Sequence, residues 1–277
     1  MIKHSSIRLR QRGFSLVEMA VVLAIVGLLL AGAMYTLSAQ MEQRSREETQ
    51  RRLEQAREAL LGFAVANGRL PCPASGATTG VEADLPVGSG ACTNAYNGFL
   101  PAITLGYQPV DEQGFALDAW NNRIRYAVAT TINSCVGAAP ATPHFTSKTN
   151  LKQNGMSCQP GANDLLICQS SVTAPAPAPG SCGPAGNALT NSNPSGTVVA
   201  VVFSTGKNYA LATTAAAATA AGKPDEAANL DNNSVFISHT PTPADMPAAG
   251  GGEFDDMVIW IPVGTFYGRL ATAGVLP

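Results

Sequence analysis

The sequence predicts an α+β protein with a long N-terminal helix and a C-terminal domain built on an antiparallel sheet. Two observations support this fold class. No proline occurs in residues 14–66, and short β-like segments separated by turns recur after residue 120. The aromatic content of 6%, with 27 Gly and 19 Pro, indicates a loop-rich domain rather than a dense enzyme core.

The N-terminus combines a short basic leader with a long apolar segment. Residues 1–13 contain four Lys or Arg side chains and no acidic one, so we expect them to stay on the cytoplasmic side of a membrane. Residues 14–39 follow, and Glu18 is the one charge among these 26 residues. As a helix they would extend about 39 Å, enough to cross the ~30 Å hydrocarbon core of a bilayer.

Three interpretations of this segment compete. A secretory signal peptide would be cleaved after residues 37–39 (Leu-Ser-Ala), but the apolar run is longer than the usual 7–15 residues. A plain transmembrane anchor leaves Glu18 unexplained, because an ionised carboxylate inside a bilayer costs a few kcal/mol and usually has a partner. The third interpretation is a signal for processing and assembly.

The sequence Gly-Phe-Ser-Leu-Val-Glu at residues 13–18, followed by a long apolar run, resembles the class III signal of type IV prepilins and type II secretion pseudopilins. The resemblance implies that prepilin peptidase cuts between Gly13 and Phe14 and that Phe14 is then N-methylated. It also assigns Glu18 to assembly, since this carboxylate could pair with the Phe14 amine of a neighbouring subunit and fix the axial register.

The same resemblance implies a pilin-like fold and a structural, non-catalytic function. The chain would first sit in the bacterial inner membrane with a single pass and a periplasmic C-terminal domain, and then in a filament. The implied partners are sister pilin or pseudopilin subunits, the prepilin peptidase/methyltransferase and an inner-membrane assembly platform. The filament could belong to a type IV pilus, a type II secretion system or a DNA-uptake machine.

Tyr35 stands where major pilins and the major pseudopilin usually carry proline, which favours a minor subunit. The alternatives are a major structural pilin, or a membrane-tethered periplasmic enzyme or binding module. Direct nucleic-acid binding has little support, because no Lys/Arg-rich face with interleaved aromatic residues is present.

Residues 40–67 continue the helix with a charged composition. Their Arg and Glu side chains are spaced for pairs at i,i+3 and i,i+4, and we expect residues 40–52 to face solvent. An apolar stripe should bury against the C-terminal domain: Leu53, Ala56, Leu60, Phe63 and Ala64. Asn67-Gly68 ends the helix.

The C-terminal domain, residues 68–277, is expected to form an antiparallel sheet laid against this helix. The predicted strands are residues 123–130, 165–169, 197–204 and 257–261, with 234–238 as a short edge strand. Two further helices are predicted at residues 208–221 and 266–273, the second of which should turn Phe266 and Leu270 inward.

All six cysteines follow the apolar segment, and none forms a CxxC pair. Beyond a membrane-targeting segment, an even count without metal spacing indicates disulfides rather than zinc. We expect local pairs Cys72–Cys92, Cys135–Cys158 and Cys168–Cys182, although six cysteines allow 15 connectivities.

No cofactor is expected apart from structural calcium. Asp118-Ala119-Trp120-Asn121-Asn122, with Tyr126, resembles the Asp-x-Trp-Gly…Tyr segment of the major pseudopilin, in which a nearby loop holds calcium. Asp255 and Asp256, or Asp111 and Asp118, could supply hard oxygen ligands here. The alternative is that these carboxylates cap turns, with Trp120 as a core anchor between sheet and helix.

The sequence gives little support for a catalytic site. Ser204-Thr205-Gly206-Lys207 matches a bare Ser-x-x-Lys pattern, but its usual partner motifs are missing and it follows a predicted strand. His144 and His239 lie in loops rich in Pro and Thr, so a histidine-based triad lacks a well-placed base. We therefore expect no enzymatic activity.

Overall fold

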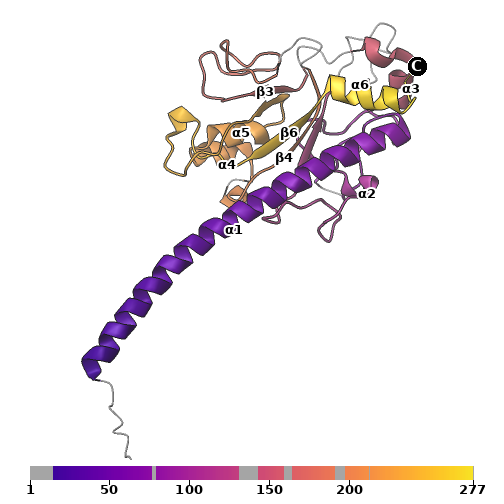
Figure 1. The fold of residues 1–277 in the computed structure, drawn as a ribbon. Helices are drawn as coiled ribbons and strands as arrows, with labels where there is room; N and C mark the ends of the chain where they lie inside the picture. Colours follow the sequence, from indigo (N-terminus) through magenta and orange to yellow (C-terminus); the bar gives the residue numbers. More distant parts are fainter. Residues whose placement is uncertain are drawn as a thin grey trace, which may run out of the picture. The chain divides into compact units, whose positions relative to one another are not determined.

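The computed structural model describes residues 15–76, 79–130, 143–158, 164–190, 197–211 and 213–276, without the side chains of residues 30–38 and 211. The chain divides into two compact units, Met1–Arg46 and Glu47–Pro277. Figure 1 shows the ribbon of both units.

Helix α1, Leu16–Asn67, is the longest element, with 52 residues. It ends at Gly68, whose φ of 69° is the left-handed conformation that glycine adopts readily and whose N–H donates to the Ala64 carbonyl (2.8 Å). The predicted helix over residues 14–66 is confirmed within the described residues. It continues past position 35 without interruption.

The described residues of the first unit form the N-terminal part of α1, and their apolar side chains are exposed, from Leu16 (88%) to Leu29 (68%). The predicted membrane segment, residues 14–39, lies only partly within the description. Within the part of the chain that the structure describes, no helix is long and apolar enough to cross a membrane.

A four-stranded antiparallel sheet forms the centre of the second unit, in the order β1-β2-β4-β6. Its strands are β1 (Gly98–Phe99), β2 (Arg125–Val128), β4 (Val198–Ser204) and β6 (Met257–Pro262). Every residue of β4 is buried, as its continuous apolar sequence predicts. The antiparallel sheet is confirmed, with β1 as an additional short strand.

Two predicted strands lie in a different sheet. β3 (Leu166–Cys168) and β5 (Val235–Ile237) pair with each other in parallel, and not with the central sheet. The long connection between them, which includes β4, permits the parallel arrangement. The Asn229 side chain also forms hydrogen bonds with the β5 backbone. It accepts from the Ile237 N–H (2.7 Å) and donates to the Ile237 carbonyl (3.1 Å).

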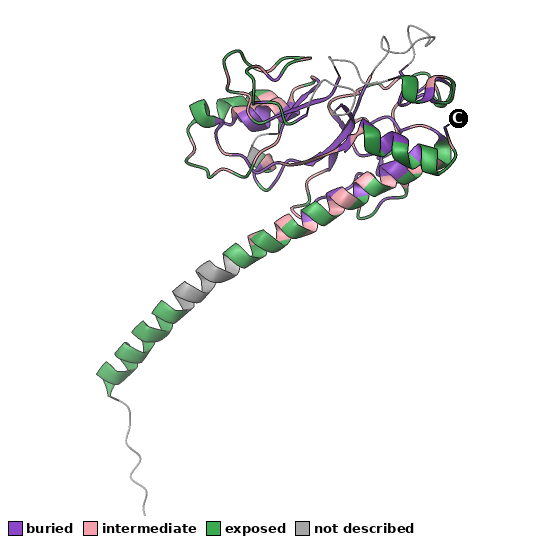
Figure 2. Cartoon of the chain, turned by 45° about the horizontal axis from the view of Figure 1, so that its top comes forward, coloured by how far each residue is buried: buried purple, intermediate pink, exposed green. Residues whose placement is uncertain are grey.

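The C-terminal part of α1 packs into the hydrophobic core. Leu53, Ala56, Leu60 and Ala64 have no exposed surface and belong to one cluster with residues of β2 and β4. Figure 2 shows buried residues along this part of α1. Phe63 is only half-buried, whereas Leu61 is buried in its place. The stripe is therefore confirmed, but rotated slightly toward Leu61.

The charged part of α1 forms the expected pairs, including Glu42–Arg46 (3.2 Å) and Glu48–Arg52 (2.8 Å). The expectation that residues 40–52 face solvent is wrong at its end. Arg52 donates to the Leu117 and Asp118 carbonyls, and Thr49 is fully buried, where its hydroxyl accepts from the Ala119 N–H. These contacts fasten the loop before β2 to the helix.

The remaining helices are short. They are α2 (Ala102–Leu105), α3 (Lys148–Asn154), α4 (Ala215–Ala220), α5 (Pro224–Leu230) and α6 (Val263–Thr272), with 3₁₀ turns at Gly155–Ser157, Tyr209–Leu211 and Ala248–Gly250. The prediction for α6 is confirmed, and Phe266 and Leu270 are buried. The single helix predicted over residues 208–221 is wrong, because Thr214 caps a new helix by accepting from the Ala217 N–H.

Disulfides join Cys72 to Cys92 and Cys168 to Cys182, closing loops with sequence separations of 20 and 14 residues. Cys158 is also disulfide-bonded. Its predicted partner, Cys135, lies outside the described residues.

Candidate functional site

The start of α1 is built by a reciprocal pair of hydrogen bonds between Ser15 and Glu18. The Ser15 Oγ accepts from the Glu18 N–H (3.2 Å), and the Glu18 Oε2 accepts from the Ser15 N–H (2.9 Å). This arrangement is a capping box, which satisfies two backbone donors at the first turn of a helix. The sequence pattern Ser-x-x-Glu before an apolar run is its signature, so the capping box could have been predicted from residues 15–18.

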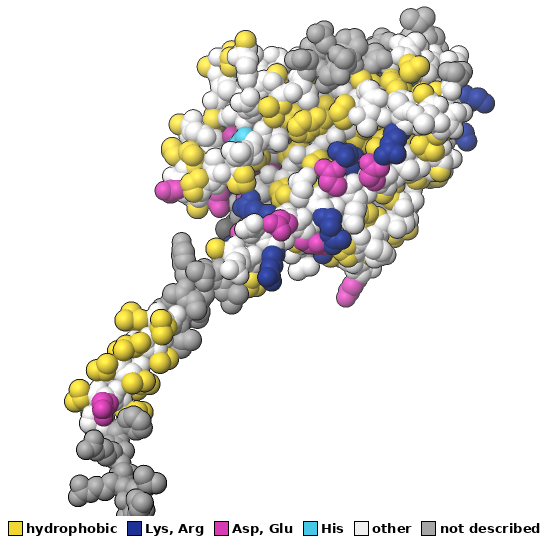
Figure 3. All heavy atoms as spheres, viewed as in Figure 1, with side chains coloured by type: hydrophobic (Ala, Val, Ile, Leu, Met, Phe, Trp, Pro, Cys, Tyr) yellow, Lys and Arg dark blue, Asp and Glu magenta, His cyan; other side chains and the backbone are white. Residues whose placement is uncertain are grey.

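Glu18 lies on an exposed, otherwise apolar helix surface. Its neighbours on the same helix, Val17, Val21 and Val22, are 70%, 52% and 50% exposed. Figure 3 shows hydrophobic side chains over this described N-terminal part of α1. A carboxylate offers about four acceptor positions, so the capping bond leaves room for a cationic group from another chain. Gly13 and Phe14, the predicted processing residues, lie outside the described residues.

Asp118 organises the turn that leads into β2. Its Oδ1 accepts from the Trp120 and Asn122 N–H groups (2.9 and 2.8 Å), and its Oδ2 accepts from the Ser204 hydroxyl (2.6 Å). Burial raises the pKa of Asp118 against the effect of these bonds. The residue therefore acts as a turn cap, the alternative considered for it, and it does not join the other predicted calcium ligands.

Two further expectations concern the neighbours of Asp118. Trp120 is only half-buried, so the prediction of a core anchor is wrong; Tyr126, which is fully buried, fills the core instead. Ser204, the serine of the Ser-x-x-Lys pattern, is buried and engaged in the turn, since its hydroxyl also accepts from the Gly206 N–H (3.1 Å). Asp111 pairs with Arg123 (2.7 Å) at the start of the same segment.

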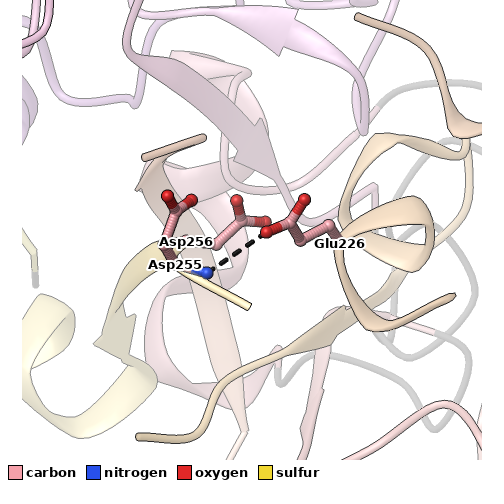
Figure 4. A group of neighbouring side chains, drawn as sticks. All are labelled: Glu226, Asp255 and Asp256. Carbon is pink, nitrogen blue, oxygen red and sulfur yellow. Dashed lines mark hydrogen bonds between the residues drawn. The ribbon is translucent and has the colours of Figure 1, made fainter. Parts of the chain in front are cut away.

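Asp255 and Asp256 lie immediately before β6, and Glu226 of α5 lies beside them (Figure 4). One carboxylate oxygen from each of the three lies within 4.8 Å of the others, and all three residues are buried. The Asp255 N–H donates to the Glu226 Oε1 (3.2 Å), and Asn229 donates to the Asp256 Oδ2 (2.8 Å). This cluster has the composition of a site for a hard cation.

Burial is the main cause of unusual pKa values in this cluster. It raises the pKa of Asp255 to about 7, with the neighbouring Glu226 carboxylate as the second cause. The pKa values of Asp256 and Glu226 are raised for the same reason, that of Asp256 strongly. Three carboxylates in a buried space disfavour simultaneous ionisation unless a cation compensates them.

Glu226 was not among the residues predicted from the sequence. The pattern Pro-Asp-Glu at residues 224–226 is typical of the first turn of a helix and would have predicted α5, but not its proximity to Asp255. That proximity depends on the path of the 28 residues between Glu226 and Asp255, which include β5.

Neither His144 nor His239 belongs to a catalytic triad within the described part of the chain. His239 lies 3.3 Å from the buried Asp225, but Ser170 and Ser171 donate their hydroxyls to this same carboxylate rather than contacting the imidazole. Hydrogen bonds from these three residues hold the Asp225 carboxylate in place. His144 is fully buried and contacts the Tyr267 hydroxyl (3.1 Å).

These features define a class of protein. A long helix contributes its C-terminal part to an α+β unit, and its capped N-terminal part presents an apolar surface that carries the Glu18 carboxylate. Residues 8–34 match the family model described as the prokaryotic N-terminal methylation motif. The chain thus carries the signal of type IV pilins and pseudopilins, which supports a pilin-like or pseudopilin protein. Comparisons with curated proteins and with solved structures found no match.

Proposed function

We propose that the chain is a structural subunit, a minor pilin or pseudopilin, of a type IV pilus-like or type II secretion filament. Prepilin peptidase processes it after Gly13, Phe14 is N-methylated, and the N-terminal helix enters the filament. The match of residues 8–34 to the methylation motif, with Glu18 in place, carries this proposal. The capped start of α1 and the exposed apolar side chains that follow it are consistent with a helix that packs against other helices.

Before assembly, the chain is held in the inner membrane by residues 14–39, with residues 68–277 in the periplasm. The support for this topology comes from the sequence, which places a basic leader before 26 residues with one charge. The disulfides of the second unit agree with an oxidising compartment. Sister subunits, the peptidase and an assembly platform are the partners in this proposal.

Intact mass spectrometry of the membrane-extracted chain tests the processing step. We expect the loss of residues 1–13 and the addition of one methyl group to Phe14. A chain that is uncut, or cut after Ala39, would contradict the proposal and would favour a membrane-tethered enzyme or binding module.

The proposed role of Glu18 in pairing with a neighbouring subunit can be separated from its role as a helix cap. Glu18→Gln removes the charge but keeps an oxygen that can accept from the Ser15 N–H, whereas Ser15→Ala removes the capping oxygen and keeps the charge. If Glu18 pairs with the Phe14 amine of a neighbour, Glu18→Gln should lower filament incorporation more than tenfold, because a buried charge loses its partner at a cost of about 3 kcal/mol or more. Ser15→Ala should lower it by about fivefold at most, since a cap contributes about 1 kcal/mol.

Incorporation is measured as the fraction of the chain in sheared or sedimented filaments, with processing followed by mass in the same samples. Glu47→Gln, a change at an exposed acidic residue of the same helix, is the matched control. If Glu18→Gln assembles like the unmodified chain while Glu18→Ala and Ser15→Ala fail equally, Glu18 acts as a cap and the charge-pairing role is wrong.

A further inference from the structure

His239 contacts two acceptors at once, and this decides its protonation state. Its Nδ1 lies 2.7 Å from the Thr240 carbonyl oxygen, and its Nε2 lies 3.3 Å from the Asp225 Oδ2. A carbonyl oxygen and an ionised carboxylate only accept hydrogen bonds, and a neutral imidazole has a single N–H. Both contacts are therefore hydrogen bonds when the ring is a cationic imidazolium, and one of them is lost when the ring is neutral.

The Asp225 carboxylate is buried, with 1% of its side chain exposed, and is surrounded by donors. Its Oδ1 accepts from the N–H and the hydroxyl of Ser171 (2.5 and 2.7 Å) and from the Ser170 hydroxyl (3.2 Å). Burial raises the pKa of Asp225, but the hydrogen bonds from His239 and Ser171 outweigh this effect and lower the pKa. Asp225 is therefore an anion, and a buried anion needs a cation beside it.

The surroundings of the imidazole favour its charged form. The ring stacks on Phe254, with centroids 4.0 Å apart and an interplanar angle of 26°. The face of an aromatic ring attracts a cation. Lys223, immediately before α5, contacts Glu253 (2.6 Å) and Glu226 (3.6 Å), so its ammonium is engaged outside the pair.

The contact between Asp225 and His239 joins segments that are distant in the sequence. Ser170 and Ser171 follow β3, His239 follows β5, and Asp225 lies in the first turn of α5. Because β3 and β5 are parallel, the segments that follow them leave their sheet at the same edge. The chain continues from Ser171 into residues 172–179, which contain three Ala-Pro repeats and are mostly exposed. The pair thus lies at the base of this proline-rich loop.

We propose that His239 and Asp225 form a proton-operated latch. With the proton bound, the imidazolium fastens residues 238–242, the segment after β5, to the first turn of α5. Loss of the proton leaves the buried Asp225 carboxylate without its cation, which loosens this segment and the base of the proline-rich loop. The latch goes beyond the proposed filament function and does not depend on it.

Proton linkage gives the direction of the effect. Burial lowers the pKa of His239, but the hydrogen bonds to Asp225 and to the Thr240 carbonyl outweigh burial and raise the pKa above 6.5. The latch therefore contributes its full stabilisation below pH 6.5, until Asp225 takes up a proton below pH 3.8, and loses it as the pH rises through the folded-state pKa of His239. His144, whose pKa burial lowers to about 4, is neutral in the folded chain above pH 6.5.

Nuclear magnetic resonance of the histidine rings, in the full-length chain in detergent, measures the first consequence. The chain has three histidines, and the signal that disappears in His239→Gln belongs to His239. We expect this signal to titrate with a midpoint above 6.5. Asp225→Asn should lower the midpoint to 6.5 or less, because a neutral amide does not attract the proton. Asp245→Asn, at an exposed carboxylate in the same unit, is the matched control and should leave the midpoint unchanged.

Hydrogen exchange followed by mass spectrometry measures the second consequence. The N–H groups of Ser238 and Thr242 donate to the Cys168 and Phe254 carbonyls, so their exchange reports the opening of the segment after β5. Exchange is compared at pH 6 and pH 9 after correction for the intrinsic rate. Relative to His239→Gln, the protection of the wild type should fall about tenfold for each unit by which the His239 midpoint exceeds 6.5.

A His239 midpoint at or below 6.5, or one that Asp225→Asn does not move, would overturn the latch. Equal losses of protection in the wild type and His239→Gln would overturn it as well. If His239→Gln does not fold, the signals lost in His4→Gln and His144→Gln identify His239 by elimination, and the wild-type midpoint decides. Both measurements use single chains, so a negative result leaves the filament proposal intact.

Discussion

His144 is held inside the second unit in its neutral form, which makes the stability of the fold depend on pH. It has no exposed surface, lies with its ring edge-on to Phe145 (4.9 Å) and contacts the Tyr267 hydroxyl. The Tyr267 hydroxyl donates to the Cys158 carbonyl, so the imidazole Nε2 donates to the tyrosine oxygen. Burial lowers the pKa of His144 from 6.5 to about 4 and outweighs the opposite effect of the Gly155 backbone.

The sign of the effect follows from proton linkage. Between pH 6.5 and 4 the unfolded chain binds a proton at His144 and the folded chain does not, so acidification favours unfolding. Relative to neutral pH, this difference in pKa lowers the free energy of unfolding by about 2 kcal/mol at pH 5 and by about 3 kcal/mol near pH 4. Buried carboxyls with a raised pKa, such as Asp255, change stability in the opposite direction.

The assay must therefore compare two chains rather than two pH values alone. Urea unfolding of the full-length chain in detergent, followed by the fluorescence of its two tryptophans, gives the free energy of unfolding at pH 7 and pH 5. His144→Gln keeps an amide that can donate to Tyr267 and does not titrate. We expect the wild type to lose about 2 kcal/mol more than His144→Gln over this interval. Equal losses in the two chains would show that His144 does not cause the pH dependence of stability.

Three other expected outcomes concern stability. Leu60→Ala in the core face of α1 should cost about 2–5 kcal/mol, whereas Leu189→Ala, at a residue 43% exposed, should cost far less in the same urea assay. Replacing both Cys72 and Cys92 by serine should lower the free energy of unfolding by about 3 kcal/mol. Non-reducing peptide mapping of the unmodified chain should yield the two cysteines in one linked peptide. Their recovery in separate peptides would exclude the disulfide. Tyr107→Phe removes the hydrogen bond to the Arg52 carbonyl (2.9 Å) and should cost about 1 kcal/mol, so an unchanged unfolding midpoint would show that this contact contributes nothing.

The strands and the core stripe of α1 could be predicted because each depends on local sequence pattern. β4 is a continuous apolar run, and the residues of α1 that bury recur at helical spacing. The pattern did not decide between Phe63 and Leu61, which flank the stripe on opposite sides of the helix. The cation–π contact between Arg69 and the Phe63 ring holds that side chain at the edge of the core, and no periodicity encodes it.

Strand pairing was not predictable from the same patterns. β3 and β5 are short apolar runs that would suit either sheet, and their parallel pairing follows from the path of the chain between them. The side chain of Asn229 that bonds both backbone groups of Ile237 is likewise a tertiary contact. Their positions in the chain match the prediction, but they form a separate sheet.

The N-terminal signal can be identified without a structure, because its parts are contiguous: a basic leader, the Gly13–Phe14 junction, Glu18 and an apolar run. Which carboxylates meet depends on the folded chain. Asp118, Asp255 and Asp256 were equivalent candidates in the sequence, yet Asp118 caps a turn while Asp255 and Asp256 meet Glu226. The physical reason is that buried charges cluster through the folding of distant segments, and neither composition nor spacing records that proximity.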